Sequence, residues 1–266
     1  MDGMALPLKL PGPAMQQDYK PSDDLLENRV ILVTGAGDGI GRAAALAFAA
    51  HGATVVLLGK TVSKLEAVYD KIERAGGPEP AIFPMQLEGA TPYDYGELAH
   101  AIDSNLGRLD GILHNAALHP YLSRIKDYET EDWLKVIQVN LNAPFMITQA
   151  CLPLLERSPD ASVVFTTDAA GRRGKAYWGA YGASKFAIEG LTQTLAAELE
   201  NTPIRVNCID PGPTRTAMRK RLFPGEDNAT LKAPEVLMPL YLWAIGPDSQ
   251  GVTGQRLTWE QSEPLG

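Results

Sequence analysis

The sequence predicts an α/β protein of one domain, built on a doubly wound parallel β-sheet with helices on both faces. Three observations predict this fold class. Short apolar runs, typical of strands buried on both faces, alternate with helical patterns along most of the chain. A glycine-rich loop joins the first of these runs to the first helical pattern. No repeat, low-complexity tract or linker divides the 266 residues, a length that suits one domain.

The predicted domain begins after an N-terminal arm, residues 1–27. Four prolines and the lack of apolar periodicity indicate an extended or partly disordered arm. Whether part of it packs on the domain is left open. We expect the domain to span residues 28–259, with residues 260–266 as a C-terminal tail.

Strands and helices are expected in regular alternation from residue 30 onward. The predicted strands are residues 30–33, 54–58, 81–86, 110–114, 162–167 and 204–209. The predicted helices are residues 43–50, 62–74, 95–106, 131–155 and 179–200. Alternation of this length indicates parallel strands joined by right-handed crossovers.

The loop after the first predicted strand, residues 34–41, reads TGAGDGIG. Glycine permits a tight turn and a close approach of the backbone to a pyrophosphate, which the N-terminus of the following helix then binds. A glycine-rich turn without a ligand is the alternative, but the strand before and the helix after favour a dinucleotide. The candidate cofactor-binding residues of the loop are Gly35, Gly37, Asp38, Gly39, Ile40 and Gly41.

The end of the second predicted strand indicates which dinucleotide is bound. An acidic residue there is typical of NAD, whereas a basic residue accommodates the 2′-phosphate of NADP. Here Lys60 and Thr61 follow Gly59, and no carboxylate is present. We therefore favour NADP(H) over NAD(H). Two observations argue against NADP(H). Lys60 could simply begin a solvated helix, and Asp38 would repel the extra phosphate.

Tyr181 and Lys185 are four residues apart in a helical pattern and so share one helix face. A lysine ammonium beside a phenol favours the phenolate and lowers a tyrosine pKa that is ordinarily about 10. Such a tyrosine exchanges protons with a substrate oxygen near neutral pH. In isolation the pair favours an ordinary amphipathic helix, because this spacing arises easily by chance, and the functional interpretation depends on the rest of the chain.

Taken in order, these motifs resemble the landmarks of the short-chain dehydrogenase/reductase (SDR) family, over about residues 28–259. The segment 34–41 resembles its TGxxxGxG loop, and residues 114–117 (HNAA) resemble its NNAG element with two letters altered. Further matches are Asn140 at the tetrad asparagine, Tyr181 and Lys185 at YxxxK, and Pro211-Gly212 followed by Thr216. The stretches 178–181, 215–218 and 238–243 are similar to the YciK-like bacterial branch of the family.

The resemblance implies an NAD(P)-dependent oxidoreductase with a Rossmann fold, either a carbonyl reductase or an alcohol dehydrogenase. Tyr181 would be the general acid or base, and Lys185 would bind the nicotinamide ribose and lower the pKa of Tyr181. Asn140 would hold a water that connects Lys185 to solvent. Asn115 would keep the central strands and the cofactor in place.

The resemblance also implies cofactor contacts further along the chain. Gln86 stands where the family usually has an aspartate that holds the adenine, and the glutamine carbonyl accepts the same hydrogen bond. The other implied cofactor-binding residues are Leu87, Asn115, Ala116, Tyr181, Lys185, Pro211, Gly212, Thr214 and Thr216.

One position departs from the family pattern. Asp168 lies thirteen residues before Tyr181, where the family has a catalytic serine. A serine donates a hydrogen bond to the substrate oxygen, but an ionised aspartate only accepts one. Three interpretations remain open: Asp168 is protonated and donates, Thr167 supplies the hydroxyl, or the site is impaired. In the third case the protein would be a dinucleotide-binding sensor or scaffold.

Composition and net charge limit the partners, the location and the metal sites that the protein is expected to have. The net charge of −8 argues against nucleic-acid and anionic-membrane partners, and we expect no signal peptide or membrane span. Cys151 and Cys208 are isolated, as in a reducing cytoplasm, and the histidines form no metal-binding pair.

Loops near residues 119–124, 172–177 and 214–224 are expected to contact a small-molecule substrate. The basic side chains in the last two would attract an anion or merely be solvated. The family resemblance implies a homodimer or homotetramer.

Overall fold

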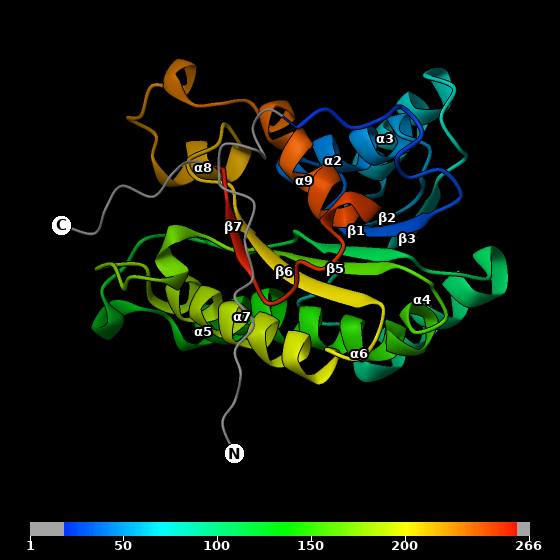
Figure 1. Ribbon diagram of the computed structural model, residues 1–266. Helices are drawn as coiled ribbons and strands as arrows, with labels where there is room; N and C mark the ends of the chain where they lie inside the picture. Colours follow the sequence, from blue (N-terminus) through cyan, green and yellow to red (C-terminus); the bar gives the residue numbers. More distant parts are fainter. Residues whose placement is uncertain (1–18, 260–266) are drawn as a thin grey trace.

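The computed structural model describes residues 19–259 as three layers, with a parallel sheet between two layers of helices (Figure 1). The sheet has seven strands in the order β3-β2-β1-β4-β5-β6-β7. The strands are β1 (Val30–Thr34), β2 (Thr54–Gly59), β3 (Ala81–Pro84), β4 (Gly111–His114), β5 (Ala161–Thr166), β6 (Ile204–Asp210) and β7 (Arg256–Thr258). Every neighbouring pair is parallel. The predicted fold class is confirmed.

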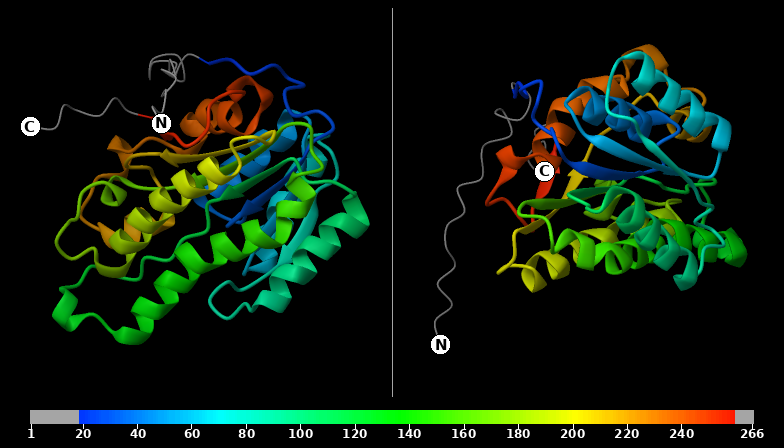
Figure 2. Two further views of the ribbon diagram at one scale, coloured as in Figure 1. Left: turned by 60° about the horizontal axis from the view of Figure 1, so that its bottom comes forward. Right: turned by 90° about the vertical axis from the view of Figure 1, so that its right-hand side faces the viewer.

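The helices are divided between the two faces of the sheet, as the two further views in Figure 2 also show. One face carries α2 (Gly39–Ala50), α3 (Val62–Arg74) and α9 (Met238–Ile245). The other carries α4 (Pro92–Leu106), α5 (Thr130–Ile137), α6 (Ala143–Leu155) and α7 (Gly179–Glu198). A short helix, α8 (Ala217–Leu222), lies beyond the end of β6. Each helix layer encloses its own apolar core, because the central strands are buried on both faces.

The course of the chain through the sheet creates a crevice at one end. β1 pairs with β2 on one side and with β4 on the other, so the strand order reverses at β1. The connections after β1 and β4 therefore leave toward opposite faces. In open α/β sheets, ligands bind at such a switch point, beyond the carboxyl ends of the strands. The loop 34–41 lies at this point.

The described part of the N-terminal arm packs on the domain. Leu26 is fully buried in the core formed by α2 and α9, and its backbone N–H donates to the His51 carbonyl at 2.8 Å. The hydroxyl of Tyr19 donates to Asp248 at 2.8 Å. Residues 1–18 and 260–266, which cover most of the predicted arm and the predicted tail, lie outside the described residues.

The helix predicted at residues 131–155 is interrupted. Between α5 and α6 the residues Gln138–Asn142 form a π-helical turn, in which the Ala143 N–H donates to the Gln138 carbonyl. The cause is visible in the sequence, since Pro144 has no N–H to donate to the carbonyl four residues earlier, that of Asn140. The prediction of a helical stretch over residues 131–155 did not include this π-helical turn, which contains the candidate site residue Asn140. β3 likewise ends at Pro84, two residues before the predicted end.

None of the helices between residues 19 and 259 combines the length and apolar character that a membrane crossing needs.

Candidate active site

A cavity of about 500 Å³ lies at the carboxyl ends of β1, β4, β5 and β6, and α8 forms part of its wall. It joins the glycine-rich loop to the tyrosine–lysine pair. The sequence-predicted residues that line it are Gly35, Gly37, Asp38, Gly39, Ile40, Lys60, Thr61, Leu87, Asn115, Ala116, Asp168, Tyr181, Lys185, Pro211, Gly212, Thr214 and Thr216. Three predicted site residues, Gly41, Gln86 and Asn140, are not part of the lining.

Gly41 and Gln86 lie outside the cavity for different reasons. A Cβ atom on Gly41 would lie 2.4 Å from the Gly35 carbonyl oxygen and 2.6 Å from the Asn115 amide nitrogen. Gly41 therefore lets helix α2 approach the loop closely and does not itself face a ligand. Gln86 is exposed, whereas its neighbours Met85 and Leu87 are buried and line the cavity.

The glycine-rich loop fits a dinucleotide phosphate. Gly35 and Gly39 have φ values of +69° and +53°, a backbone conformation that favours glycine. Both line the cavity, and Gly39 is the first residue of α2, so the N-terminus of this helix faces the cavity. Since helix N-termini present free N–H groups and a positive dipole end, this part of the cavity suits a pyrophosphate.

Hydrogen bonds connect the carboxyl ends of β1 and β4 beside this loop. The backbone N–H groups of Asn115 and Ala116 each donate to the Thr34 hydroxyl at 3.0 Å. This hydroxyl thus fixes the HNAA segment against the start of the glycine-rich loop.

At the nucleotide end of the cavity, acidic and basic side chains are paired. Asp38 caps α2 by accepting from the Gly39 N–H at 2.8 Å, and it also accepts from the Lys64 ammonium at 2.5 Å. The hydrogen bond from Lys64 lowers the pKa of Asp38. Lys60 pairs with Glu88 at 3.4 Å. Lys64 was missed as a site residue in the sequence; it lies in the first turn of α3, directly after the Lys60-Thr61 pair that was singled out.

Tyr181 and Lys185 lie on adjacent turns of α7, and both are nearly fully buried. The Lys185 ammonium donates to the Thr166 carbonyl at 2.7 Å and lies 5.3 Å from the centroid of the Tyr181 ring. Burial lowers the pKa of Lys185 to about 8. The pKa of Tyr181 is raised well above its ordinary value, first by burial and then by the carboxylates of Asp168 and Asp210. The net shift of the Tyr181 pKa is therefore upward, opposite to the lowering expected from Lys185.

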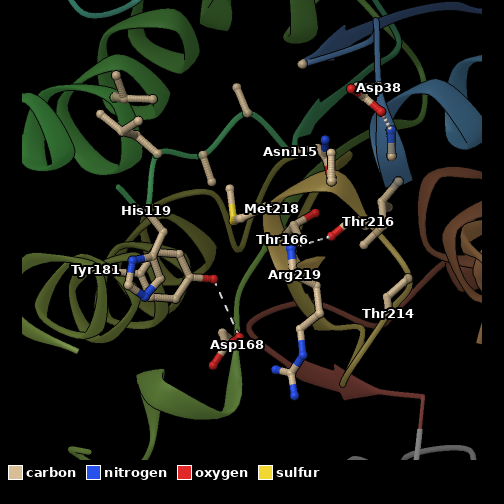
Figure 3. Close-up of a pocket in the computed structure, with 18 of the residues that line it drawn as sticks. Asp38, Asn115, His119, Thr166, Asp168, Tyr181, Thr214, Thr216, Met218 and Arg219 are labelled. Carbon is tan, nitrogen blue, oxygen red and sulfur yellow. Dashed lines mark hydrogen bonds between the residues drawn. The ribbon is translucent and has the colours of Figure 1, made fainter. Parts of the chain in front are cut away.

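Asp168 faces the tyrosine. Its Oδ2 accepts from the Tyr181 hydroxyl at 3.5 Å, and its Oδ1 accepts from the Ala170 N–H at 2.7 Å (Figure 3). The Thr167 hydroxyl donates instead to Glu189 at 3.0 Å and is buried. The interpretation in which Thr167 supplies the missing hydroxyl is therefore wrong, because that hydroxyl is already bonded away from Tyr181.

Asn140 lies behind the cavity in the π-helical turn and is 2% exposed. Its amide donates to the Leu118 carbonyl at 3.0 Å and to the Ser184 hydroxyl at 3.1 Å, and its carbonyl oxygen accepts from the Leu118 N–H at 2.7 Å. Both N–H groups of the amide are used. The side chain therefore fixes the loop after β4 against α7 and has no donor left for a water.

The segment after β6 reaches back over the glycine-rich loop. The Gly212 N–H donates to the Asp210 carboxylate at 2.9 Å, and the Thr214 hydroxyl donates to the Gly212 carbonyl at 3.0 Å. Thr216 caps α8, and its methyl carbon would lie 3.3 Å from a Cβ atom on Gly39. These contacts hold Thr216 against the glycine-rich loop, and both threonines line the cavity.

His119 lies directly on the tyrosine and was missed as an individual site residue. Its ring is stacked on the Tyr181 ring with centroids 4.3 Å apart (Figure 3). The residue is 1% exposed, and neither ring nitrogen has a hydrogen-bond partner. Burial, together with the charges of Arg221 and Lys185, lowers its pKa to about 4, so the ring is neutral at pH 7. Buried polar atoms without partners are rare in proteins, and a ligand is one explanation.

Residues 19–259 contain no group of three or more histidine, cysteine, aspartate or glutamate side chains placed to hold a metal ion.

Comparison with known proteins agrees with this geometry. The family model for short chain dehydrogenases matches residues 29–227. The uncharacterized oxidoreductase YciK of Escherichia coli (strain K12) is 51% identical over 236 residues, which cover 89% of this chain and 93% of that protein. The 3-oxoacyl-(acyl-carrier-protein) reductase FabG of Thermotoga maritima is 32% identical over 240 residues, covering 86% of this chain and 95% of the relative.

Solved structures are equally similar. A short chain dehydrogenase structure from Pseudomonas syringae superposes with a TM-score of 0.90 at 53% identity, covering 91% of this chain and 99% of that one. A structure from Escherichia coli CFT073 complexed with NADPH gives a TM-score of 0.88 at 50% identity and covers 91% of this chain and 100% of that one. The chain therefore belongs to the short-chain dehydrogenase/reductase family and is similar to its YciK-like members.

Proposed function

We propose that this protein transfers a hydride between NADP(H) and a carbonyl or alcohol substrate, with Tyr181 as the general acid or base. One observation carries the proposal: the Tyr181 hydroxyl and Lys185 line the same cavity as the glycine-rich loop. In this arrangement a bound nicotinamide cofactor and the Tyr181 hydroxyl would share one cavity. The activity would be that of a carbonyl reductase or an alcohol dehydrogenase.

A bound nicotinamide cofactor supplies the hydride, and the chain supplies position and proton transfer. Glycines of the loop and the N-terminus of α2 would hold the pyrophosphate, and Thr214 and Thr216 would contact the nicotinamide end. Tyr181 would hold its proton at the hydroxyl oxygen and donate it to the substrate oxygen during reduction. Lys185, fixed by its bond to the Thr166 carbonyl, would hold positive charge beside the reacting oxygen below a pH of about 8.

Relatives support both the reaction class and the cofactor. FabG is named as a reductase, and structures with 49% and 50% identity were solved as complexes with NADP and NADPH. They give no support to the alternative of a dinucleotide-binding sensor or scaffold. We extend NADP(H) binding, in preference to NAD(H), to this chain.

Assembly and location follow by inference. Phe145 on α6 and Phe186 on α7 are each nearly half exposed, at 44% and 46%. We propose that these helices pair between copies, giving a homodimer or homotetramer. The two cysteines, Cys151 and Cys208, are buried and free, which is compatible with the cytoplasmic location we propose.

The test of the proposed function is NADPH consumption by the purified chain over a broad panel of aldehydes and ketones. We expect turnover with at least one class of carbonyl compound, and NADP⁺ reduction with the corresponding alcohol. Tight NADPH binding without turnover of any member would contradict an enzymatic function and support a binding protein.

Lys64 is expected to set the preference for NADP(H). The Lys64 side chain is 53% exposed and its ammonium pairs with Asp38, so a 2′-phosphate near Lys60 would meet two lysines and a carboxylate that is already neutralised. Charge-assisted hydrogen bonds are worth about 1.5–3 kcal/mol, so Lys64→Ala should raise the KM for NADPH about tenfold and leave the KM for NADH almost unchanged.

The matched control is Lys71→Ala, which removes the same charge from an exposed position on α3 outside the cavity. Steady-state kinetics with both cofactors measure the effect. Equal increases in KM for NADPH and NADH in the Lys64 variant would show that Lys64 does not read the 2′-phosphate.

A further inference from the structure

The substrate end of the cavity has an aromatic wall, made of His119, Trp178, Tyr181 and Phe223. Ring centroids are 4.3 Å apart for His119 and Tyr181, 5.4 Å for His119 and Trp178, and 6.3 Å for Trp178 and Phe223. The four rings come from three separate segments of the chain, and all line the cavity. The rings are inclined to one another by 22° to 64°, so they offer both ring faces and ring edges to an aromatic ligand, the two arrangements that aromatic pairs prefer.

Six basic side chains line the same cavity, and they differ in whether a carboxylate pairs with them. The lining cations are Lys60, Lys64, Lys175, Lys185, Arg219 and Arg221. Lys60, Lys64 and Arg219 form ion pairs with Glu88, Asp38 and Glu226. Lys185 is buried and bonded to a backbone carbonyl. Within residues 19–259, Lys175 and Arg221 have no carboxylate partner, and both are exposed.

Both cations contact residues of the aromatic wall. The Lys175 ammonium lies 5.0 Å from the centroid of the Trp178 ring, and the Arg221 guanidinium donates to the His119 carbonyl at 2.7 Å. A guanidinium carries five N–H donors, so Arg221 keeps most of its hydrogen-bonding capacity. Lys175 precedes α7 and Arg221 lies on α8, so the two approach the wall from different elements.

The charges of the cavity are separated along its length. The carboxylates of Asp168 and Asp210 lie at the inner end, next to Tyr181, and Asp210 is 9% exposed. The other titratable groups there are Lys185, Arg219, Arg256, His119, Cys208 and Tyr181, and Arg256 forms an ion pair with Asp210. The carboxylate of Asp168, which has no ion-pair partner within residues 19–259, therefore repels an anionic group from the Tyr181 hydroxyl, whereas the exposed and unpaired cations Lys175 and Arg221 attract one. The neutral His119 ring between them adds one donor and one acceptor without charge.

We infer that the substrate is an anionic aromatic carbonyl compound or the corresponding alcohol, whose ring stacks on the aromatic wall and whose carboxylate binds Lys175 and Arg221. This inference rests on the proposed function and goes further by naming the substrate class. The carboxylate lies away from the reacting carbon, which faces Tyr181. Solvation alone would explain why one basic side chain is exposed here. It does not explain why two unpaired cations both contact residues of the aromatic wall.

The experiment compares carboxylic acids with their methyl esters, which share size and ring but differ in charge. The probes are 4-acetylbenzoate, 3-acetylbenzoate and 3-benzoylpropionate, each with its methyl ester and NADPH. We expect the wild type to favour at least one acid, with a ratio of kcat/KM for acid over ester of about ten or more, since one charge-assisted hydrogen bond is worth about that factor. Lys175→Gln and Arg221→Gln should each lower this ratio, and the double variant should bring it to about one, a total loss of about tenfold or more.

Lys220→Gln is the matched control, because Lys220 is an exposed neighbour of Arg221 on α8 and does not line the cavity. It changes the net charge equally and should keep the ratio of the wild type. A wild-type ratio of one or less for all three pairs would overturn the inference while leaving the proposed function intact. So would an equal fall of the ratio in the Lys220 variant, which would indicate a general effect of charge.

Binding separates failure of this inference from failure of the proposed function. Quenching of tryptophan fluorescence by each acid and ester, with NADP⁺ present, gives dissociation constants that do not depend on turnover. Acids that bind about tenfold tighter than their esters, with the difference lost in Arg221→Gln, support the inference even if no carbonyl is reduced. Esters that bind as tightly as the acids contradict it.

Discussion

Replacing Tyr181 by phenylalanine is expected to lower kcat for carbonyl reduction by about 10³-fold, the usual range for loss of a general acid being 10² to 10⁴. The hydroxyl of Tyr181 lies in the cavity at the inner carboxylates, and the change removes the proton that it would donate. The ring itself stays, so its stacking on His119 and its contact with Trp178 persist. We therefore expect a melting temperature close to that of the wild type and an NADPH dissociation constant changed by less than tenfold.

The control is Tyr128→Phe, which removes a hydroxyl from the same apolar cluster. The Tyr128 hydroxyl is buried without a hydrogen-bond partner and does not line the cavity. Its loss should leave kcat within about twofold of the wild type, because no bond is broken. Single-turnover kinetics with prebound NADPH separate the chemical step from product release. A Tyr181 variant that retains a tenth or more of the wild-type rate would rule out the proposed proton donor.

The sheet and its main helices were predictable because their signals are local. β1 is buried along its whole length, which appears in the sequence as an unbroken apolar run. β7 was not predicted, since it has three residues and pairs only with β6. Its formation depends on a neighbour distant in sequence, which periodicity does not detect. The π-helical turn at Asn140 has a visible cause in Pro144, but a proline near a helix start is also compatible with an undisturbed helix.

The candidate site was predictable where a motif fixes both residue and place, as for Tyr181 and Lys185. It was not predictable where function depends on contacts between separate elements. The pairing of Asp38 with Lys64 would neutralise the repulsion expected between Asp38 and a 2′-phosphate, and this pairing joins a loop to a helix residue 26 positions away. His119 carries no motif, and its position over Tyr181 depends on contacts from distant elements, the hydrogen bonds of Asn140 to Leu118 and of Arg221 to the His119 carbonyl.

Exchanging Asp168 for serine is expected to raise kcat for carbonyl reduction by about 10²-fold, the lower end of the effect of one oxyanion donor. Both carboxylate oxygens act as acceptors here, Oδ1 from the Ala170 N–H and Oδ2 from the Tyr181 hydroxyl. A serine would still cap the turn at Ala170 and would offer its own O–H to the substrate oxygen. Asp168→Asn is the comparison variant, because it removes the charge at nearly constant size. A slower serine variant would mean that Asp168 donates a proton in the wild type.

Replacing Asp168 is also expected to shift the pH dependence of kcat, in a direction that follows from the pKa of Tyr181. The carboxylate of Asp168 contributes, after burial, to raising the pKa of Tyr181, so its removal should lower that pKa. Carbonyl reduction requires the protonated phenol and fails when Tyr181 ionises. The alkaline limb of kcat that belongs to Tyr181 should therefore move to lower pH in Asp168→Ser and in Asp168→Asn. Alcohol oxidation requires the phenolate and should gain rate over the same interval. An alkaline limb that stays unmoved in both variants would mean that the carboxylate does not act on Tyr181, and any gain in rate would then come from the serine hydroxyl alone.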